Sequence, residues 1–302
     1  MSMTTETPTP SISSNAKQIK RVLWQVLVLN FLVAGAKIAV GSLTGSLSMV
    51  ADGFHSAMDG TSNVIGLVGI TIAGRPPDDE HPYGHQKYET FATLAIGLLL
   101  LLTTWNILKS AITRLLEGSS PEVTVVSFIV MFVTMGINWA VSRYESQQGK
   151  KLKSSVLLAD SAHTRSDVYV SLSVIGGLTA VWLGWPWVDT VVALIIVVVI
   201  GRVGWEIIRR ASNTLADSAV VDPAEVEKIA LSVDGVISCH KIRSRGTDLA
   251  TYLDLHIQVD SHMSLAEAHY LSHQVQDRLQ QDLDLTDVVV HAEPDELLVK
   301  QP

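Results

Sequence analysis

Six long apolar segments occupy the first two thirds of this 302-residue chain and constrain its fold more than any other feature. Each has roughly the 20 residues that an α-helix needs to cross the hydrocarbon core of a bilayer. A backbone in lipid must satisfy its own hydrogen bonds, so such segments form helices. The segments lie at residues 20–42, 46–73, 89–114, 121–145, 154–182 and 186–208. The sequence therefore predicts an α-helical membrane protein with a six-helix transmembrane bundle.

The composition changes after about residue 210, where the apolar runs end and the chain becomes polar and acidic. We expect three parts: a disordered Thr/Ser/Pro-rich tail over residues 1–16, a transmembrane domain over 17–212 and a cytoplasmic metal-binding regulatory domain over 213–302. The net charge of −8 gives no support for nucleic-acid binding. Cys239 is the single cysteine, which excludes both an intrachain disulfide and a thiolate metal cluster.

Lysine and arginine residues indicate the orientation of the six segments. They gather at residues 17–21, 75–87, 143–153 and 209–210, whereas the turns after the first and fifth segments contain none. Because basic loops stay on the cytoplasmic side, both termini are expected in the cytoplasm. The sequence thus predicts a multi-pass integral membrane protein, which we place in the plasma (inner) membrane.

Two of the apolar segments carry the same polar motif. Residues 51–59 and 159–167 both read A-D-x-x-H-x-x-x-D, at a constant offset (163 − 55 = 108; 167 − 59 = 108). His and Asp four residues apart share one helix face. Two facing pairs would offer two imidazoles and two carboxylates, a donor set that Zn²⁺ binds tetrahedrally. The predicted ligands are His55, Asp59, His163 and Asp167, and the alternative is two His–Asp hydrogen bonds without a metal.

Four other polar residues lie in or beside these segments. Asp52 and Asp160 each precede a motif histidine by three residues. Each either accepts a hydrogen bond from the imidazole and fixes its tautomer, or is a polar group at a helix end. Arg165 is expected to face away from the metal site, because it lies about 200° around the helix from both His163 and Asp167. The simplest interpretation of Lys37 is that its side chain snorkels towards the membrane interface.

The part after residue 220 has the predicted order αββαβ, a small α+β sandwich. Asp222 resembles an N-cap before a first helix, and Ser264 with Glu267 has capping-box spacing before a second. Six histidines lie here: His240, His256, His262, His269, His273 and His291. Histidine is the commonest metal ligand, although surface histidine is also ordinary. The loop over residues 78–85 is similarly either a divalent-cation site or a solvated loop.

These residues together resemble the cation diffusion facilitator family, the zinc-transporter group of proton-coupled metal exporters. The resemblance runs from about Ile19 to Pro294. It is carried by the two H-x-x-x-D pairs, by the His-Pro-Tyr-Gly-His run at 81–85 with Lys87 and Glu89, and by the His-rich C-terminal part. It implies a six-helix membrane domain, a cytoplasmic metallochaperone-like (ferredoxin-like) αββαβ domain and a homodimer.

The resemblance also implies functional residues beyond the repeated motif. A second metal would bind in the loop through Asp78, His81 and His85. A binuclear cytoplasmic cluster would use His240, His256, His269 and His291, with Glu293 in place of the family's bridging aspartate. A charge pair would join Lys87 to Asp217.

The motifs and the resemblance predict Zn²⁺/H⁺ antiport by alternating access, with Zn²⁺ both transported and regulatory and protons as the counter-ion. His55 favours zinc, because broad-range bacterial members have aspartate there and imidazole suits Zn²⁺ better than Mn²⁺. The alternatives are broader efflux of Fe²⁺, Co²⁺, Cd²⁺ or Mn²⁺, and a non-transporting membrane metal sensor. We expect no enzyme, because the four motif positions are all ligand types and no H-E-x-x-H run occurs.

Overall fold

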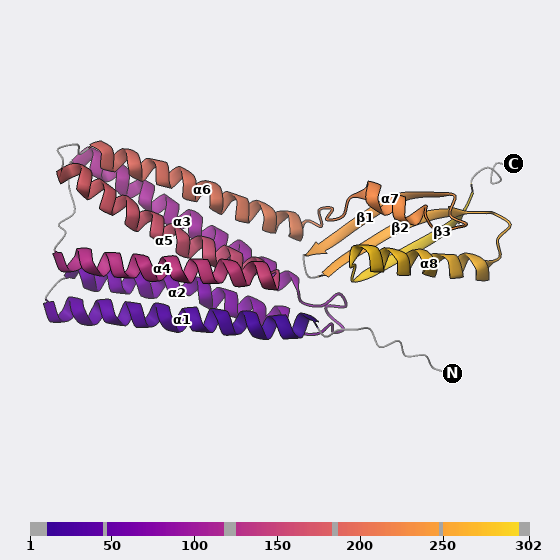
Figure 1. Cartoon of the computed structure of the whole chain (residues 1–302), viewed down its shortest axis with the longest axis horizontal. Helices are drawn as coiled ribbons and strands as arrows, with labels where there is room; N and C mark the ends of the chain where they lie inside the picture. The colour runs from indigo at the N-terminus through magenta and orange to yellow at the C-terminus, as the bar shows by residue number, and fades with distance from the viewer. Residues whose placement is uncertain (1–10, 45–46, 118–124, 183–186, 248–249, 296–302) are drawn as a thin grey trace. The chain divides into compact units, whose positions relative to one another are not determined.

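The structure is a computed structural model that describes residues 11–44, 47–117, 125–182, 187–247 and 250–295. The chain divides into two compact units, Met1–Ser212 and Asn213–Pro302. Among the described residues, the regular elements of the first unit are long helices, and the second unit contains a three-stranded sheet with two shorter helices (Figure 1).

The helices of the first unit match the six apolar segments of the sequence. They are α1 (Ser11–Thr44), α2 (Leu47–Ala73), α3 (Lys87–Glu117), α4 (Val125–Leu152), α5 (Ser155–Trp182) and α6 (Trp187–Leu215). The helix α1 begins at Ser11, so the expected disordered tail is wrong for residues 11–16. Extending a helix backwards from a stable apolar span costs little, because nucleation is the unfavourable step. Residues 1–10 of the predicted tail lie outside the described residues.

Two stretches of the described chain qualify as candidate membrane spans by length and apolar composition, Asn15–Val40 and Lys87–Thr113. The helix α5 illustrates why a motif-bearing helix has lower hydropathy. Its polar residues Asp160, His163, Thr164 and Ser166 are all buried inside the unit. Such a helix is stable in lipid when its polar face is turned towards neighbouring helices.

Close contacts hold the motif-bearing helices in place. The helix α2 packs along α1 and also contacts α3 and α5, while α4 packs along α5. At Gly69 the backbone of α2 approaches α3 so closely that a Cβ atom there would clash with the Cβ of Ala92. Small residues allow this close helix packing in membranes.

The start of α5 is fixed by a carboxylate from α3. The Ser154 hydroxyl donates to Glu89 Oε1 at 2.6 Å, and the Val156 N–H donates to the same oxygen at 3.4 Å. A negative charge at a helix N-terminus is favourable, because the first backbone N–H groups have no partner within the helix. Glu89 therefore fixes the end of α5 that leads to its metal-ligand motif.

The second unit has the predicted order αββαβ: α7 (Pro223–Ala230), β1 (Ser238–Thr247), β2 (Ala250–Val259), α8 (Leu265–Leu283) and β3 (Asp287–Pro294). The sheet order is β1-β2-β3, with β2 antiparallel to β1 and parallel to β3. Both expected caps are present. Asp222 accepts a hydrogen bond from the Ala224 N–H, and Ser264 and Glu267 form a reciprocal capping box.

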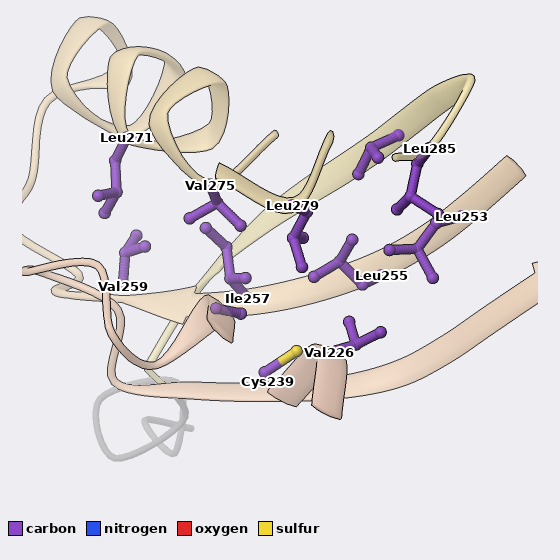
Figure 2. Packing of buried hydrophobic residues seen from close by; sticks show 12 residues of the cluster. Val226, Cys239, Leu253, Leu255, Ile257, Val259, Leu271, Val275, Leu279 and Leu285 are labelled. Atoms are coloured by element: carbon purple, nitrogen blue, oxygen red, sulfur yellow. The ribbon is translucent and has the colours of Figure 1, made fainter. Parts of the chain in front are cut away.

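The core of this unit follows from the alternation of β2. Leu253, Leu255, Ile257 and Val259 are all buried and share one face of the strand. Figure 2 shows them opposite the buried residues of α8, which are Leu271, Val275 and Leu279. Cys239 of β1 joins this core, and its burial raises the pKa of the thiol to about 11.

Replacing Ile257 by alanine should lower the free energy of unfolding of this unit by about 2–5 kcal/mol, because it leaves a cavity in a fully buried position. Denaturant unfolding of residues 213–302 measures the change. Leu265→Ala is the control, because that side chain is 88% exposed and its loss should cost no more than about 0.5 kcal/mol. Equal losses would contradict the assigned core.

Candidate metal sites

Three potential ligands of the repeated motif converge inside the first unit. Asp59 of α2 and His163 and Asp167 of α5 each offer a ligand atom, and these atoms lie within 4.8 Å of one another. They line a cavity of about 20 Å³. A water molecule needs about 10–15 Å³ of such space, so the cavity has the size of one water or one small ion. One imidazole and two carboxylates make a donor set suited to a divalent metal.

The fourth predicted ligand is His55. Its side chain and that of Asp52 lie outside the described residues, so both stay predictions. The helix α2 runs without interruption over Leu47–Ala73. His55 is therefore one turn before Asp59 and shares its helix face.

Lys37 of α1 lines the same cavity. Its side chain is only 8% exposed, and its Nζ donates to Ser56 Oγ at 2.7 Å. The snorkelling interpretation of Lys37 is therefore wrong, because the ammonium group turns into the bundle and not towards an interface. An ammonium group beside two carboxylates offsets part of their charge.

Asp160 is held by α2 and not by the neighbouring histidine. The Asn63 amide donates to Asp160 Oδ2, and the Asn30 amide donates to Asn63 Oδ1 at 2.9 Å. Among the described residues, neither Asp160 Oδ1 nor His163 Nδ1 has a hydrogen-bond partner. The predicted Asp160–His163 hydrogen bond is thus wrong for the described residues, and the completely buried Asp160 is partnered by α2 instead.

Glu145 of α4 is a buried polar residue that the sequence analysis missed. It is completely buried and accepts a hydrogen bond from Thr164 Oγ1 at 3.2 Å. Glu145 lies at the end of an apolar segment, where acidic residues usually face the membrane interface. Its burial was therefore not expected from the sequence. The available signal was its spacing of three residues from Ser142, because Ser142 also faces α5 and donates to the Ser161 carbonyl at 2.8 Å.

The loop between α2 and α3 brings its three predicted ligands together. One ligand atom each from Asp78, His81 and His85 lies within 4.8 Å of the others. The His81 N–H donates to Asp78 Oδ1 at 2.7 Å, and His85 Nε2 lies 3.4 Å from Asp78 Oδ2. The backbone hydrogen bond from His81 lowers the pKa of Asp78, with smaller contributions from the two imidazoles. The carboxylate is therefore ionised and available as a ligand at neutral pH.

Three histidines of the second unit form a row across the sheet. His240 of β1 is in register with His256 of β2, and His256 is in register with His291 of β3. Glu293 lies beside all three. Its carboxylate oxygens are 3.1 Å from His240 Nε2, 2.6 Å from His256 Nδ1 and 3.7 Å from His291 Nε2. Strand register alone thus builds a group of three imidazoles and one carboxylate.

His269 does not belong to this row within one chain. It lies on α8, where its ring centroid is 4.5 Å from that of His273. The helix α8 covers the apolar face of the sheet, whereas His256 alternates with the core residues of β2 and so lies on the other face. The predicted Lys87–Asp217 pair would join the two units, and it stays a prediction.

Comparison with known proteins identifies the chain. Residues 23–216 match the cation efflux transmembrane domain, and residues 221–295 match the cation efflux protein, cytoplasmic domain. The chain belongs to the cation diffusion facilitator family. It is therefore a membrane-embedded transporter that carries out divalent metal cation efflux, and its family consists of transporters and not enzymes.

Relatives in archaea and bacteria span nearly the whole chain. Uncharacterized transporter MJ0449 of Methanocaldococcus jannaschii is 32% identical over 92% of this chain and 99% of its own length. Manganese efflux system protein MneS of Bacillus subtilis is 28% identical over 89% of this chain and 93% of its own length.

Among solved structures, a variant of the MamM CTD is 26% identical, covering 24% of this chain and 91% of that chain, with a TM-score of 0.23.

Replacing His256 by leucine should raise the pKa of Glu293. The hydrogen bond from His256 is the main cause of the lowered pKa, ahead of the charge of Lys241. Because the folded pKa is lowered, the ionised carboxylate stabilises the unit above its ordinary pKa, and this contribution is lost as the pH falls through the lowered value. A carboxyl NMR titration of the metal-free cytoplasmic unit measures the pKa.

The control is His262→Leu. His262 lowers the pKa of Asp260 instead, so its removal should leave Glu293 unchanged. If His256→Leu and His262→Leu moved the Glu293 pKa equally, the contact between His256 and Glu293 would not be the cause.

Proposed function

We propose that this protein exports Zn²⁺ in exchange for protons through the site formed by Asp59, His163, Asp167 and His55. The observation that carries the proposal is the convergence of three of these side chains on one ion-sized cavity inside the helical unit. Ionisable groups at membrane depth are costly and mark ion pathways.

The donor set supports zinc as the transported ion. Imidazole nitrogen suits Zn²⁺, Cu²⁺, Co²⁺ and Ni²⁺, whereas Mn²⁺ prefers a shell of oxygen ligands. With His55 the site has two nitrogen and two oxygen donors, as tetrahedral Zn²⁺ sites often have. Manganese is the second candidate. The relative MneS is named for manganese efflux, and two of the three described ligands here are carboxylates.

Proton coupling would follow from the chemistry of the ligands. Imidazole and carboxylate must be deprotonated to bind a metal, so protons compete with the ion for the same groups. Histidine titrates near neutral pH, so a modest proton gradient can change its occupancy. Lys37, whose ammonium lines the same cavity, would balance the carboxylate charge after the metal leaves. Rocking of helices would expose the site to each side in turn.

The other two groups of ligands would sense metal in the cytoplasm. With both termini cytoplasmic, as the basic loops indicate, the loop site and the histidine row lie on the side from which the metal enters. We propose a homodimer in which metal bound at the row stabilises the association of two cytoplasmic units. His269 would then contribute only from a partner copy, since it lies on a helix of the opposite sheet face.

Replacing Asp167 by asparagine should reduce Zn²⁺ flux at least tenfold. The change keeps the shape of the side chain and removes the charge that binds the metal. The measurement is Zn²⁺ flux into proteoliposomes with an imposed pH gradient. Asp277→Asn, on the surface of the cytoplasmic unit, removes the same charge away from the site and should leave flux unchanged. Wild-type flux in Asp167→Asn would refute the site.

Replacing His55 by aspartate should shift selectivity towards Mn²⁺, because it exchanges a nitrogen donor for oxygen. Competition fluxes with Zn²⁺, Mn²⁺, Co²⁺ and Cd²⁺ measure the ratio in wild type and variant. An unaltered metal profile would show that His55 does not select the ion. A wild type that prefers Mn²⁺ would favour the second candidate function.

A further inference from the structure

A second and larger cavity lies between α4 and α5. It has a volume of about 490 Å³ and shares no lining residue with the metal cavity. Trp139, Arg143, Ser146 and Lys150 contribute to it from α4, and Arg165 and Tyr169 contribute from α5. Its volume is in the range that small-molecule ligands and headgroups occupy.

The cavity is strongly basic. Arg143, Lys150 and Arg165 all line it, and none of its lining residues is acidic. Throughout the described parts of the chain, these three side chains form no ion pair with a carboxylate. Arg165 is oriented by its Nε, which donates to Ser142 Oγ at 3.4 Å, and Arg143 lies 5.7 Å from the ring centroid of Trp139. Two positioned guanidinium groups and one ammonium group favour a phosphate, which arginine binds with two parallel hydrogen bonds.

The charges exclude a role for this cavity in metal entry. Three cations would repel a divalent cation, whereas the ligand site carries two carboxylates. Arg165 is exposed, while its neighbours along the helix, Thr164 and Ser166, are buried. The same helix α5 therefore turns its metal-ligand face to the bundle and exposes Arg165 on another face.

Aromatic residues beside the charges indicate a position at the membrane interface. Trp139 is 59% exposed and Tyr169 is 37% exposed, and both line the cavity. Trp and Tyr concentrate at the level of the lipid headgroups. The basic end of the cavity follows α4 towards its last turn, which contains Lys150 and Lys151. An amphipathic ligand would place its anionic group among the basic side chains and its apolar part against Trp139.

We propose that this cavity binds the phosphate headgroup of an anionic phospholipid. Basic pockets between membrane helices suit such headgroups, and each basic residue adds to the attraction of an anionic lipid. Bound there, the lipid bridges α4 and α5 and stabilises the packing of the helix that carries His163 and Asp167. Lipid binding at this cavity depends on α4 and α5 and not on which metal the protein transports. It would therefore still be expected if the transported ion were not zinc.

The test measures lipid bound to the full-length protein in detergent, by native mass spectrometry. Phosphatidylglycerol and phosphatidylcholine with matched acyl chains are the two lipid probes, and glycerol 3-phosphate is a soluble competitor. Wild type should retain phosphatidylglycerol and not phosphatidylcholine. The double substitution Arg143→Gln/Lys150→Gln should weaken phosphatidylglycerol binding by roughly tenfold or more, and Lys150→Gln alone by roughly fivefold.

The matched control is Lys151→Gln/Lys153→Gln. It removes two charges from the same end of α4, at residues that do not line the cavity. Wild-type phosphatidylglycerol binding in this control supports the site. Equal weakening in both double variants, or unchanged binding in Arg143→Gln/Lys150→Gln and Lys150→Gln, would overturn it. Displacement of the lipid by an equal concentration of glycerol 3-phosphate would also overturn it, because the ligand would then be a free phosphate ester.

Discussion

The burial of polar side chains among apolar helices is the constraint on which this membrane domain depends. The hydrocarbon core of a bilayer contains no water, so a polar side chain at this depth must form its hydrogen bonds with other groups of the protein. Asn30, Asn63 and Asp160 meet this requirement by a hydrogen-bonded chain that joins α1, α2 and α5. Lys37 and Ser56 add a second link between α1 and α2. The contacts that make these residues tolerable in a bilayer also position the helices that carry the metal ligands.

In the cytoplasmic unit, strand alternation and register position the potential metal ligands. Alternation along β2 sends every second residue to the core, and the intervening residues reach the opposite face. Register then aligns His240, His256 and His291 across three strands, with Glu293 beside them. The group needs no special loop, because ordinary sheet pairing supplies its order. Its ligands come from strands far apart in sequence, so a bound metal would link both edges of the sheet.

The sequence predicted much of this architecture because the relevant signals are local. Apolar length defined the helices of the membrane domain, and the caps at Asp222 and Ser264 defined the starts of α7 and α8. The convergence of Asp59 with His163 and Asp167 agreed with the repeated spacing. The placement of the ligand groups in the loop and along the sheet likewise followed from motif and strand order.

The errors concern contacts between residues that are distant in sequence. Nothing near Lys37 indicates that Ser56 will accept its hydrogen bond, and the spacing of Glu145 from Ser142 does not identify Thr164 of the next helix as the donor to Glu145. Spacing along one helix offers Asp160 either a hydrogen bond with His163 or a place at a helix end, whereas its partner Asn63 belongs to another helix. The resemblance groups His269 with the other histidines, and the grouping stays a prediction because His269 is separated from them only within one chain. The face on which α8 packs, which separates it from them, is a property of the folded sheet.

The environment of Cys239 has a practical consequence for studying transport. The thiolate is the reactive form of cysteine, and a buried thiol with a pKa of about 11 is almost entirely protonated at neutral pH. Cys239 is also the single cysteine of the chain. The folded native protein should therefore react very slowly with thiol-directed labels. Spectroscopic probes attached to pairs of introduced cysteines can follow helix movements while the natural core residue stays in place.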